Sequence, residues 1–315
     1  YNGFVIGPYQ HMVAKGGGAN VELYAHSGNW EPENLAEPYN PDTYYQAKEH
    51  WIVLKYSSST NVLTTIPVSP FTGLTWDNRA EPQFVRVAPN GRIWIGGRVE
   101  DTLDDVHAIL QESNSTGTAF TVKLDYRFDP LPSDPPGSNN HDSGDRFRDV
   151  AVDGDGNYYL PHTYWTPTGT GVNDRDYFRS QVLKGPVSNP ASYSIIEADN
   201  QYFTGGQTIY WNALWHHDSN ELFLGGVAYN LPASAPPTSV VNFTRRGGAS
   251  GPFTNSSVYA HNYAGGYDQP WYHSMLEMDN AGNIWQAYST HKPGDAVGKD
   301  WVPNSQTIIQ KLSCL

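Results

Sequence analysis

The amino-acid sequence predicts an all-β fold, a single five-bladed β-propeller, and three observations support this prediction. A segment made of an apolar run, a tight polar turn and an aromatic run recurs at residues 84–95, 149–160, 213–224 and 275–286. The turns of these four copies end 62 to 65 residues apart, which is typical of repeats built from strand pairs. The 30 glycines and 23 prolines, with no helical periodicity of useful length, indicate many short strands joined by turns.

The repeat assigns the whole chain, residues 1–315, to one domain of five blades. Each propeller blade is expected to contain four strands. The blades are expected at about 10–70, 80–130, 145–200, 208–262 and 272–312. In the three middle blades the strands are expected near 82–88, 92–98, 106–111 and 120–126, then 147–153, 157–162, 178–183 and 193–197, and then 211–216, 221–227, 239–244 and 257–261.

The first and last blades rest on weaker signals. Residues 12–24 form a fifth, less regular copy of the recurring segment, and they open the first blade. The last blade has only three strand segments and lacks an outer strand. Because residues 3–7 contain an apolar run, this N-terminal strand is expected to pair with the last blade, which closes the ring and removes a free sheet edge.

Composition excludes several classes of partner. The formal net charge is −13 and no basic cluster is present, so a nucleic-acid partner is not expected. No run of 18 apolar residues occurs, so the sequence predicts no membrane-spanning segment. We expect a soluble monomer whose partner is a polysaccharide or oligosaccharide.

The termini and the sequons bear on localisation. The single cysteine, Cys314, excludes an internal disulfide and a cysteine-based metal site. The chain begins at Tyr1 rather than at Met, which suggests a processed, secreted, extracellular protein. Sequons at Asn114, Asn242 and Asn255 are consistent with a glycoprotein.

A candidate site is expected where the first strands of the blades line the central tunnel. The apolar positions that face the tunnel are Val85, Val150, Leu214 and Leu276. Two residues earlier in each strand, on the same face by strand alternation, lies a polar side chain nearer the tunnel mouth. This polar ring consists of Gln83, Arg148, Asn212 and Ser274, with His11 or Met12 from the first blade. The segments that lead into these strands add further aromatic, cationic and acidic side chains, namely Tyr210, Trp211, Trp271, Tyr272, His273, Arg146 and Asp149.

The residue types in this ring suit a sugar ligand. Aromatic rings offer apolar platforms with polar edges, and arginine can hold a carboxylate through paired hydrogen bonds. A tyrosine or histidine beside an arginine can move a proton if its pKa suits the reaction.

Two parts of the sequence resemble known repeats. Residues 152–159 and 278–285 resemble the BNR/Asp-box repeat of β-propellers, and residues 177–193 resemble a strand of BNR-type polysaccharide lyases and their glycosidase relatives. The resemblance implies action on uronate-containing glycans with His, Tyr and Arg at the propeller mouth. Carried onto this chain, it implies catalytic roles for His273, Tyr272 or Tyr210, and Arg148.

The expected activity is β-elimination of a uronate-containing glycan. Arg148 would neutralise the sugar carboxylate, His273 or a tyrosine would take the C5 proton, and a tyrosine would protonate the leaving oxygen. Two alternatives stay open: a lectin-like binding module without chemistry, and a glycoside hydrolase that uses Asp149 with Asp145 or Asp268.

No cofactor and no structural metal are expected, with calcium as one open option. Residues 153–157 resemble the start of a calcium loop, and residues 141–145 are a second candidate. Because the turn at 153–157 recurs in other blades, a hairpin role is the expected one.

Overall fold

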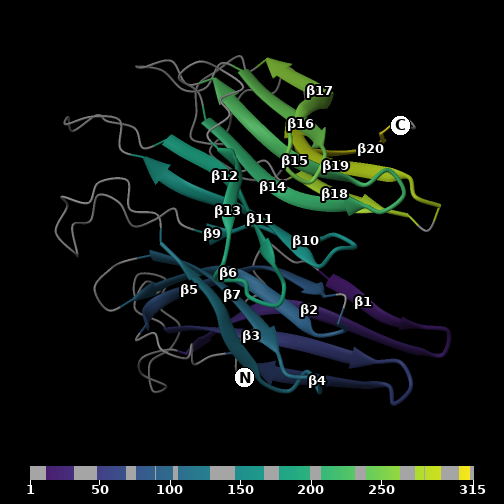
Figure 1. The fold of residues 1–315 in the computed structure, drawn as a ribbon. Coiled ribbons are helices and arrows are strands. Elements are labelled where there is room, and N and C mark those ends of the chain that lie inside the picture. Colours follow the sequence, from purple (N-terminus) through teal and green to yellow (C-terminus); the bar gives the residue numbers. More distant parts are fainter. Residues whose placement is uncertain are drawn as a thin grey trace. The chain divides into compact units, whose positions relative to one another are not determined.

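The computed structural model describes residues 12–31, 48–68, 76–88, 90–101, 106–127, 146–166, 177–198, 207–230, 239–262, 274–279, 281–291 and 305–312. All the regular structure in these ranges is β-strand, arranged in five antiparallel sheets (Figure 1). The predicted fold class, an all-β five-bladed propeller, is confirmed. The predicted closing strand at 3–7 lies outside the described residues.

The sheets follow one another along the chain, and within each sheet the strands pair in chain order, apart from one strand of two residues, Arg146–Phe147. Contacts divide the chain into two compact units, Tyr1–Asp149 with Asn189–Ala191, and Val150–Ser188 with Ser192–Leu315. We call these the first unit and the second unit, and each is described by itself.

The first unit holds two four-stranded sheets and one short strand. The first sheet consists of β1 (Met12–Gly17), β2 (Asn20–Glu31), β3 (Lys48–Ser57) and β4 (Val62–Pro67). The second consists of β5 (Trp76–Val87), β6 (Ile93–Asp101), β7 (Val106–Ser113) and β8 (Phe120–Tyr126). The short strand β9 (Arg146–Phe147) contacts β6 and β7.

The second unit holds the remaining three sheets. They consist of β10 (Ala151–Val152), β11 (Asn157–Thr166), β12 (Tyr177–Pro186) and β13 (Ser194–Ala198), then β14 (Gln207–His216), β15 (Glu221–Asn230), β16 (Ser239–Gly247) and β17 (Thr254–Asn262), and then β18 (Ser274–Met278), β19 (Ile284–His291) and β20 (Ser305–Lys311). The last sheet has three strands among the described residues, as the sequence predicts.

Each unit has a buried apolar core between neighbouring sheets. In the first unit Trp51 and Val53 of β3 pack in one cluster with Val85 of β5 and Ile95 of β6. In the second unit the ring of Tyr159 stacks on that of Trp215, with centroids 5.3 Å apart and an interplanar angle of 6°. Alternating apolar side chains on strands of adjacent sheets therefore form the core, as the period of two predicts.

Two of the recurring hairpin turns are closed by an aspartate. The carboxylate of Asp153 accepts hydrogen bonds from the backbone N–H of Asn157 at 2.8 Å and from the Tyr159 hydroxyl at 2.8 Å. Asp279 accepts equivalent bonds from the backbone of its own turn and from Nε1 of Trp285 at 2.9 Å. The recurring aspartate and aromatic residue are thus explained by one local hydrogen-bond pattern.

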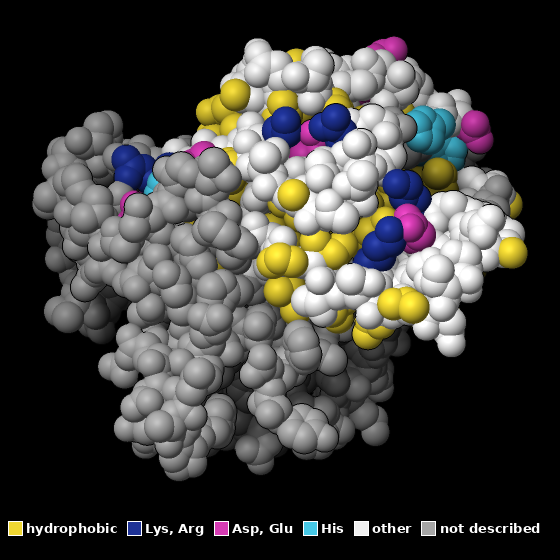
Figure 2. Space-filling view, turned by 90° about the horizontal axis from the view of Figure 1, so that it is seen from below, with side chains coloured by type: hydrophobic (Ala, Val, Ile, Leu, Met, Phe, Trp, Pro, Cys, Tyr) yellow, Lys and Arg dark blue, Asp and Glu magenta, His cyan; other side chains and the backbone are white. Residues whose placement is uncertain are grey.

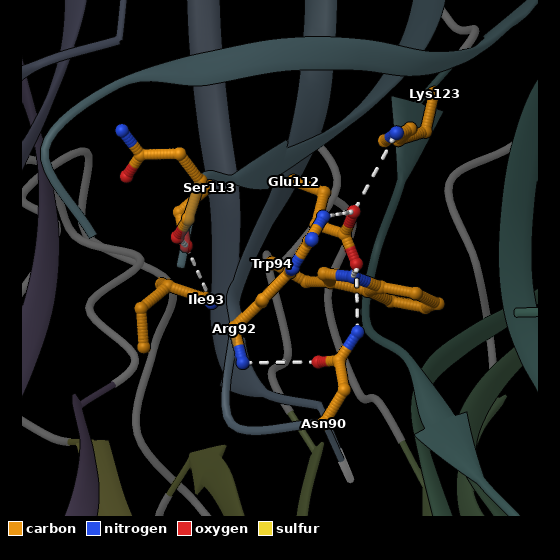
Figure 3. Close-up of polar contacts among 8 residues, drawn as sticks. Asn90, Arg92, Ile93, Trp94, Glu112, Ser113 and Lys123 are labelled. Carbon is orange, nitrogen blue, oxygen red and sulfur yellow. Dashed lines mark hydrogen bonds and ion pairs between the residues drawn. The ribbon is translucent and has the colours of Figure 1, made fainter. Parts of the chain in front are cut away.

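The second sheet keeps the aromatic residue of this turn and replaces the aspartate. Ala88 occupies the aspartate position, and the carboxylate comes from Glu112 on β7 (Figure 3). Glu112 accepts hydrogen bonds from Nε1 of Trp94 at 3.1 Å and from Arg92 at 2.9 Å, and Nζ of Lys123 lies 3.5 Å away. A carboxylate from the neighbouring strand therefore makes the bond that the turn's own aspartate makes elsewhere.

Candidate functional site

Five charged or amide side chains of the first unit meet where β5, β6 and β9 come together. Glu81 and Gln83 lie two residues apart on β5, Arg98 lies on β6, and Arg146 and Arg148 lie in or directly after β9. The guanidinium of Arg98 is hydrogen-bonded to the Glu81 carboxylate, and Nη1 of Arg146 lies 3.4 Å from its other oxygen. Nη1 of Arg148 donates to Oε1 of Gln83 at 3.0 Å. We call Arg98, Arg146 and Arg148 the arginine cluster.

The arginine cluster determines the charge state of Glu81. Burial raises the pKa of this carboxyl group, but the attraction of Arg98, Arg146 and Arg148 outweighs burial and lowers the pKa to about 2. Glu81 is therefore ionised at any physiological pH. Its side chain is 31% exposed, whereas that of Arg146 is 5% exposed, so solvent reaches the cluster at Glu81.

A β-bulge in β5 carries Gln83 toward this cluster. Pro82 pairs with Gly97 and Phe84 with Gly96, so Gln83 is the extra residue of the bulge. A Cβ atom on Gly97 would lie 2.1 Å from the Glu81 backbone oxygen, so only glycine lets the two strands approach so closely here.

Three of these side chains were singled out from the sequence. Gln83 and Arg148 were expected in one polar ring, and the structure adds the hydrogen bond between them. Arg146 was expected in the same region, and it contacts Glu81.

The equivalence of Gln83 and Asn212 in the predicted ring is wrong by one residue. In the fourth sheet Asn212 pairs with Gly225 and Tyr210 with Gly226, so Trp211 occupies the bulge position that Gln83 holds in the second sheet. The reason is the longer turn: β14 and β15 pair from His216 to Glu221, where Asn220 adopts a φ of 56°. Both Trp211 and Asn212 are buried, at 5% and 2% exposure.

Asp149 lies in a bidentate ion pair. Both of its carboxylate oxygens accept hydrogen bonds from Arg86 on β5, from Nε at 2.8 Å and from Nη2 at 2.9 Å. The Asp149 side chain is completely buried. A carboxylate held in this way is suited to joining β5 to the segment that follows β9.

Tyr210 belongs to a buried polar network of the second unit. Its hydroxyl donates to Glu197 at 3.0 Å and accepts from Nη1 of Arg245 at 3.0 Å, and Glu197 and Arg245 are themselves paired. Burial raises the pKa of Tyr210 far above its ordinary value, and the neighbouring Glu197 raises it further against the opposing effect of Arg245. The hydroxyl is therefore neutral in the working pH range and is a poor proton acceptor.

The remaining predicted site residues fall wholly or partly outside the described residues. His11, Trp271, Tyr272 and His273 lie outside them. Ser274 is the first residue of β18, and its backbone position pairs with Tyr288. The proton-transfer roles expected of Tyr272 and His273 stay predictions.

Three residues of the arrangement were not predicted: Glu81, Arg98 and Arg86. Glu81 could have been considered because it lies only two residues before Gln83 in the chain. Arg98 follows the Gly96–Gly97 pair directly, and a glycine pair inside a strand indicates a close backbone approach. No local signal links Arg86 to Asp149.

The charged side chains on the visible face of the described part lie in small mixed groups. Figure 2 shows Lys and Arg side chains directly beside Asp and Glu, with hydrophobic side chains between the groups.

No group of three or more His, Cys, Asp or Glu among the described residues is placed to hold a metal ion. In the turn considered for calcium, the Asp153 oxygens accept N–H and O–H donors, and residues 141–145 lie outside the described ranges. Within those ranges no helix is long and apolar enough to cross a membrane.

Comparisons by sequence and by structure differ in what they find. No protein-family model matches the chain, and no curated protein matches it in sequence. Among solved structures, the chain is similar to an α-L-arabinofuranosidase of family GH93 from Fusarium graminearum in complex with arabinobiose, with a TM-score of 0.48, 12% identity and coverage of 91% of this chain and 77% of that one.

Two further solved structures are similar to this chain at comparably low sequence identity. A thermostable family-43 glycoside hydrolase has a TM-score of 0.47 and 11% identity, with 98% of this chain and 91% of that one covered. The catalytic domain of a GH62 α-L-arabinofuranosidase from Coprinopsis cinerea has a TM-score of 0.42 and 13% identity, with 99% and 95% covered. At these identities and TM-scores no residue role and no activity is transferred to this chain.

Proposed function

We propose that this protein acts on an acidic polysaccharide and that the arginine cluster holds a uronate carboxylate. The observation that carries the proposal is the gathering of three buried guanidinium groups, Arg98, Arg146 and Arg148, near the carboxylate of Glu81. Guanidinium groups bind carboxylates through planar, charge-assisted hydrogen bonds, and these bonds are stronger where water is excluded. The partial exposure of Glu81 gives the side from which a ligand carboxylate approaches.

The first reaction that we propose is β-elimination. A base removes the C5 proton of the uronate, the electron pair forms the C4–C5 double bond, and the C4–oxygen bond breaks as an acid protonates the leaving oxygen. The negative charge that develops on the carboxylate during this step is the charge that the arginine cluster stabilises. Tyr272 and His273, outside the described residues, stay the proton-transfer groups expected from the sequence. The Tyr210 hydroxyl is buried and bonded within its own network, so it is not proposed for this step.

Glycosidic hydrolysis is the second candidate, and the ionised state of Glu81 favours it. A hydrolase needs one carboxylate that is ionised, to act as nucleophile or base, and a second that is protonated. Glu81 supplies an ionised carboxylate, with Arg98 on one of its oxygens and Arg146 3.4 Å from the other. Both oxygens of Asp149 are engaged by Arg86, and the Asp149 side chain is completely buried, whereas that of Glu81 is 31% exposed. Asp145 and Asp268 stay candidates for the second role. Hydrolysis of glycosides is also the activity named for the similar structures.

The decisive experiment is an assay of wild-type protein on two matched sets of glycans. One set contains polymers of galacturonate, glucuronate, mannuronate and guluronate, and the other contains the same polymers with reduced carboxyl groups. Ultraviolet absorbance of an unsaturated uronate reports elimination, and new reducing ends without that absorbance report hydrolysis. We expect cleavage of an acidic polymer and little or none of its reduced counterpart.

Variants test whether the arginine cluster is responsible. Arg146→Lys and Arg148→Lys keep the charge but lose the paired donors, and we expect kcat/KM on the acidic polymer to fall about 10- to 100-fold. Arg92→Lys is the matched control, because Arg92 pairs with Glu112 outside the cluster and its side chain is 41% exposed. Equal cleavage of acidic and reduced polymers would overturn the proposal, and saturable binding of the acidic polymer without product would favour the lectin-like alternative.

A further inference from the structure

Gln83 is a buried amide whose orientation is fixed by its neighbour. The side chain is 3% exposed, and its Oε1 accepts a hydrogen bond from Nη1 of Arg148 at 3.0 Å. A guanidinium group only donates hydrogen bonds, so the amide oxygen must face Arg148 and the amide nitrogen must point away from it. The usual ambiguity between the two amide atoms does not arise here.

The amide nitrogen of Gln83 is a donor without an acceptor among the described residues. Nε2 is buried, and no hydrogen-bond partner lies within reach in the part of the chain that the structure describes. Buried donors are nearly always satisfied, because an unsatisfied one forfeits its hydration without compensation. A buried donor that is held in a fixed direction next to a site indicates a ligand acceptor.

The strand geometry holds this donor beside the arginine cluster. Gln83 is the extra residue of the β5 bulge, and bulges commonly re-aim a side chain at a functional site. The bulge is backed by Gly97, whose missing side chain leaves room for the backbone of Glu81 and Pro82. The amide therefore lies next to the guanidinium of Arg148, and neither the Nε2 group nor the guanidinium can accept a hydrogen bond.

We infer that Gln83 is a specificity-determining residue that donates from Nε2 to a carboxylate oxygen of the uronate held by the arginine cluster. This inference rests on the proposed function, and it adds a selection rule to it. A ligand group beside Nε2 and the guanidinium must be an acceptor, so a carboxylate is favoured and an amide nitrogen or an ammonium is rejected.

The substitution Gln83→Glu tests this assignment, because it keeps one oxygen for Arg148 and replaces the donor by a negatively charged acceptor. The probes are the acidic oligosaccharides of galacturonate, glucuronate, mannuronate and guluronate, each with its carboxyl-reduced counterpart, measured by calorimetry with wild type and variant. We expect Gln83→Glu to weaken binding of the preferred acidic probe at least 10-fold and to change binding of its reduced counterpart less. Gln310→Glu on β20 is the matched control and is expected to leave binding unchanged.

The outcomes separate this inference from the proposed function. If Gln83→Glu binds the acidic probe as tightly as wild type, or more tightly, while Arg148→Lys weakens it, Gln83 only supports Arg148 and the inference fails alone. If wild type binds no acidic probe, or prefers none over its reduced form, the proposed function fails with it. Should Gln83→Glu not fold, Gln83→Met removes the donor without adding charge, and undiminished acidic binding by that variant overturns the inference.

Discussion

At the scale of single residues, the structure assigns a partner to charged side chains that the sequence presents as separate candidates. Asp149 pairs with Arg86, and Glu81 pairs with Arg98 and Arg146. Two of these pairs join β5 to the segment after residue 145: Arg86 and Asp149 are 63 residues apart in the chain, and Glu81 and Arg146 are 65 apart. A buried carboxylate without such a partner would be strongly disfavoured. These pairs therefore contribute to the fold and at the same time fix the charge of the site.

The Asp149–Arg86 pair leads to a prediction about stability. Asp149→Asn removes the charge from a fully buried, bidentate pair and leaves Arg86 with a neutral neighbour, so we expect the free energy of unfolding to fall by about 3–5 kcal/mol. Urea denaturation measures this change. Asp155→Asn, in the exposed turn after β10, is the control and should stay within about 0.5 kcal/mol of wild type. Wild-type stability of Asp149→Asn together with lost activity would instead indicate a catalytic carboxylate.

Glu81 predicts how stability depends on pH. Its pKa in the folded protein, about 2, lies below its ordinary value of 4.5, so the ionised form stabilises the native state. This stabilisation is present above about pH 4.5 and is lost as the pH falls toward 2. Glu81→Gln lacks it, so the stability difference between wild type and Glu81→Gln should shrink steadily from pH 5 to pH 2. A difference that stays constant across this range in denaturation experiments would contradict the assignment.

At the scale of elements, a β-bulge opposite a pair of glycines occurs in two sheets. A bulge in the first strand faces a glycine pair in the second strand: Gln83 faces Gly96–Gly97, and Trp211 faces Gly225–Gly226. In both cases the glycines make room for a neighbouring aromatic ring and backbone. A Cβ atom on Gly96 would lie 2.4 Å from the Phe84 ring, and one on Gly226 would lie 2.5 Å from the Phe243 ring. The repeat thus encodes a close approach of strands as well as a turn.

The glycine pair is testable by a single added methyl group. In Gly97→Ala the new Cβ would lie 2.1 Å from the Glu81 backbone oxygen, so the backbone of β5 or β6 must shift. We expect a loss of about 1–3 kcal/mol in the free energy of unfolding, with weaker binding at the arginine cluster. Gly154→Ala is the control, because its Cβ would meet no atom within 4 Å, and it should be neutral or slightly stabilising. Equal stability of the two variants would show that the bulge is not under this constraint.

At the scale of the whole molecule, the net charge of the chain repels an acidic ligand, whereas the charge of the proposed site attracts it. The chain carries a formal net charge of −13, whereas the described part of the proposed site contains Arg98, Arg146, Arg148 and Glu81. Long-range repulsion should slow the approach of an anionic polymer, and short-range hydrogen bonds should hold it once it arrives.

This opposition predicts an unusual salt dependence. Salt screens the long-range field, with a Debye length of about 30 Å at 0.01 M and about 8 Å at 0.15 M ionic strength. We therefore expect the association rate of the preferred acidic oligosaccharide to rise between these concentrations, while that of its carboxyl-reduced counterpart stays level. Stopped-flow measurements give both rates. An association rate that falls with salt would show that the local arginines, and not the net charge, dominate the approach.

The sequence by itself determined the all-β class and the recurring hairpin. These features follow from local chemistry: an aspartate or a glycine closes each turn, and a period of two places side chains on one face. Within one repeat, such signals lie close together in the chain, so they can be read without knowing the fold.

Only the tertiary structure decided which charges meet. Glu81 pairs with Arg146, and Asp149 pairs with Arg86. Tyr210 is hydrogen-bonded to Glu197 and Arg245. The single extra residue in the turn after β14 also moved Trp211, rather than Asn212, to the bulge position. The physical reason for the charged pairs is that the partners lie on different strands or segments, 13 residues apart in the chain for Tyr210 and Glu197 and 63 for Arg86 and Asp149. The pairing that satisfies a buried charge therefore depends on packing between strands that no local pattern specifies.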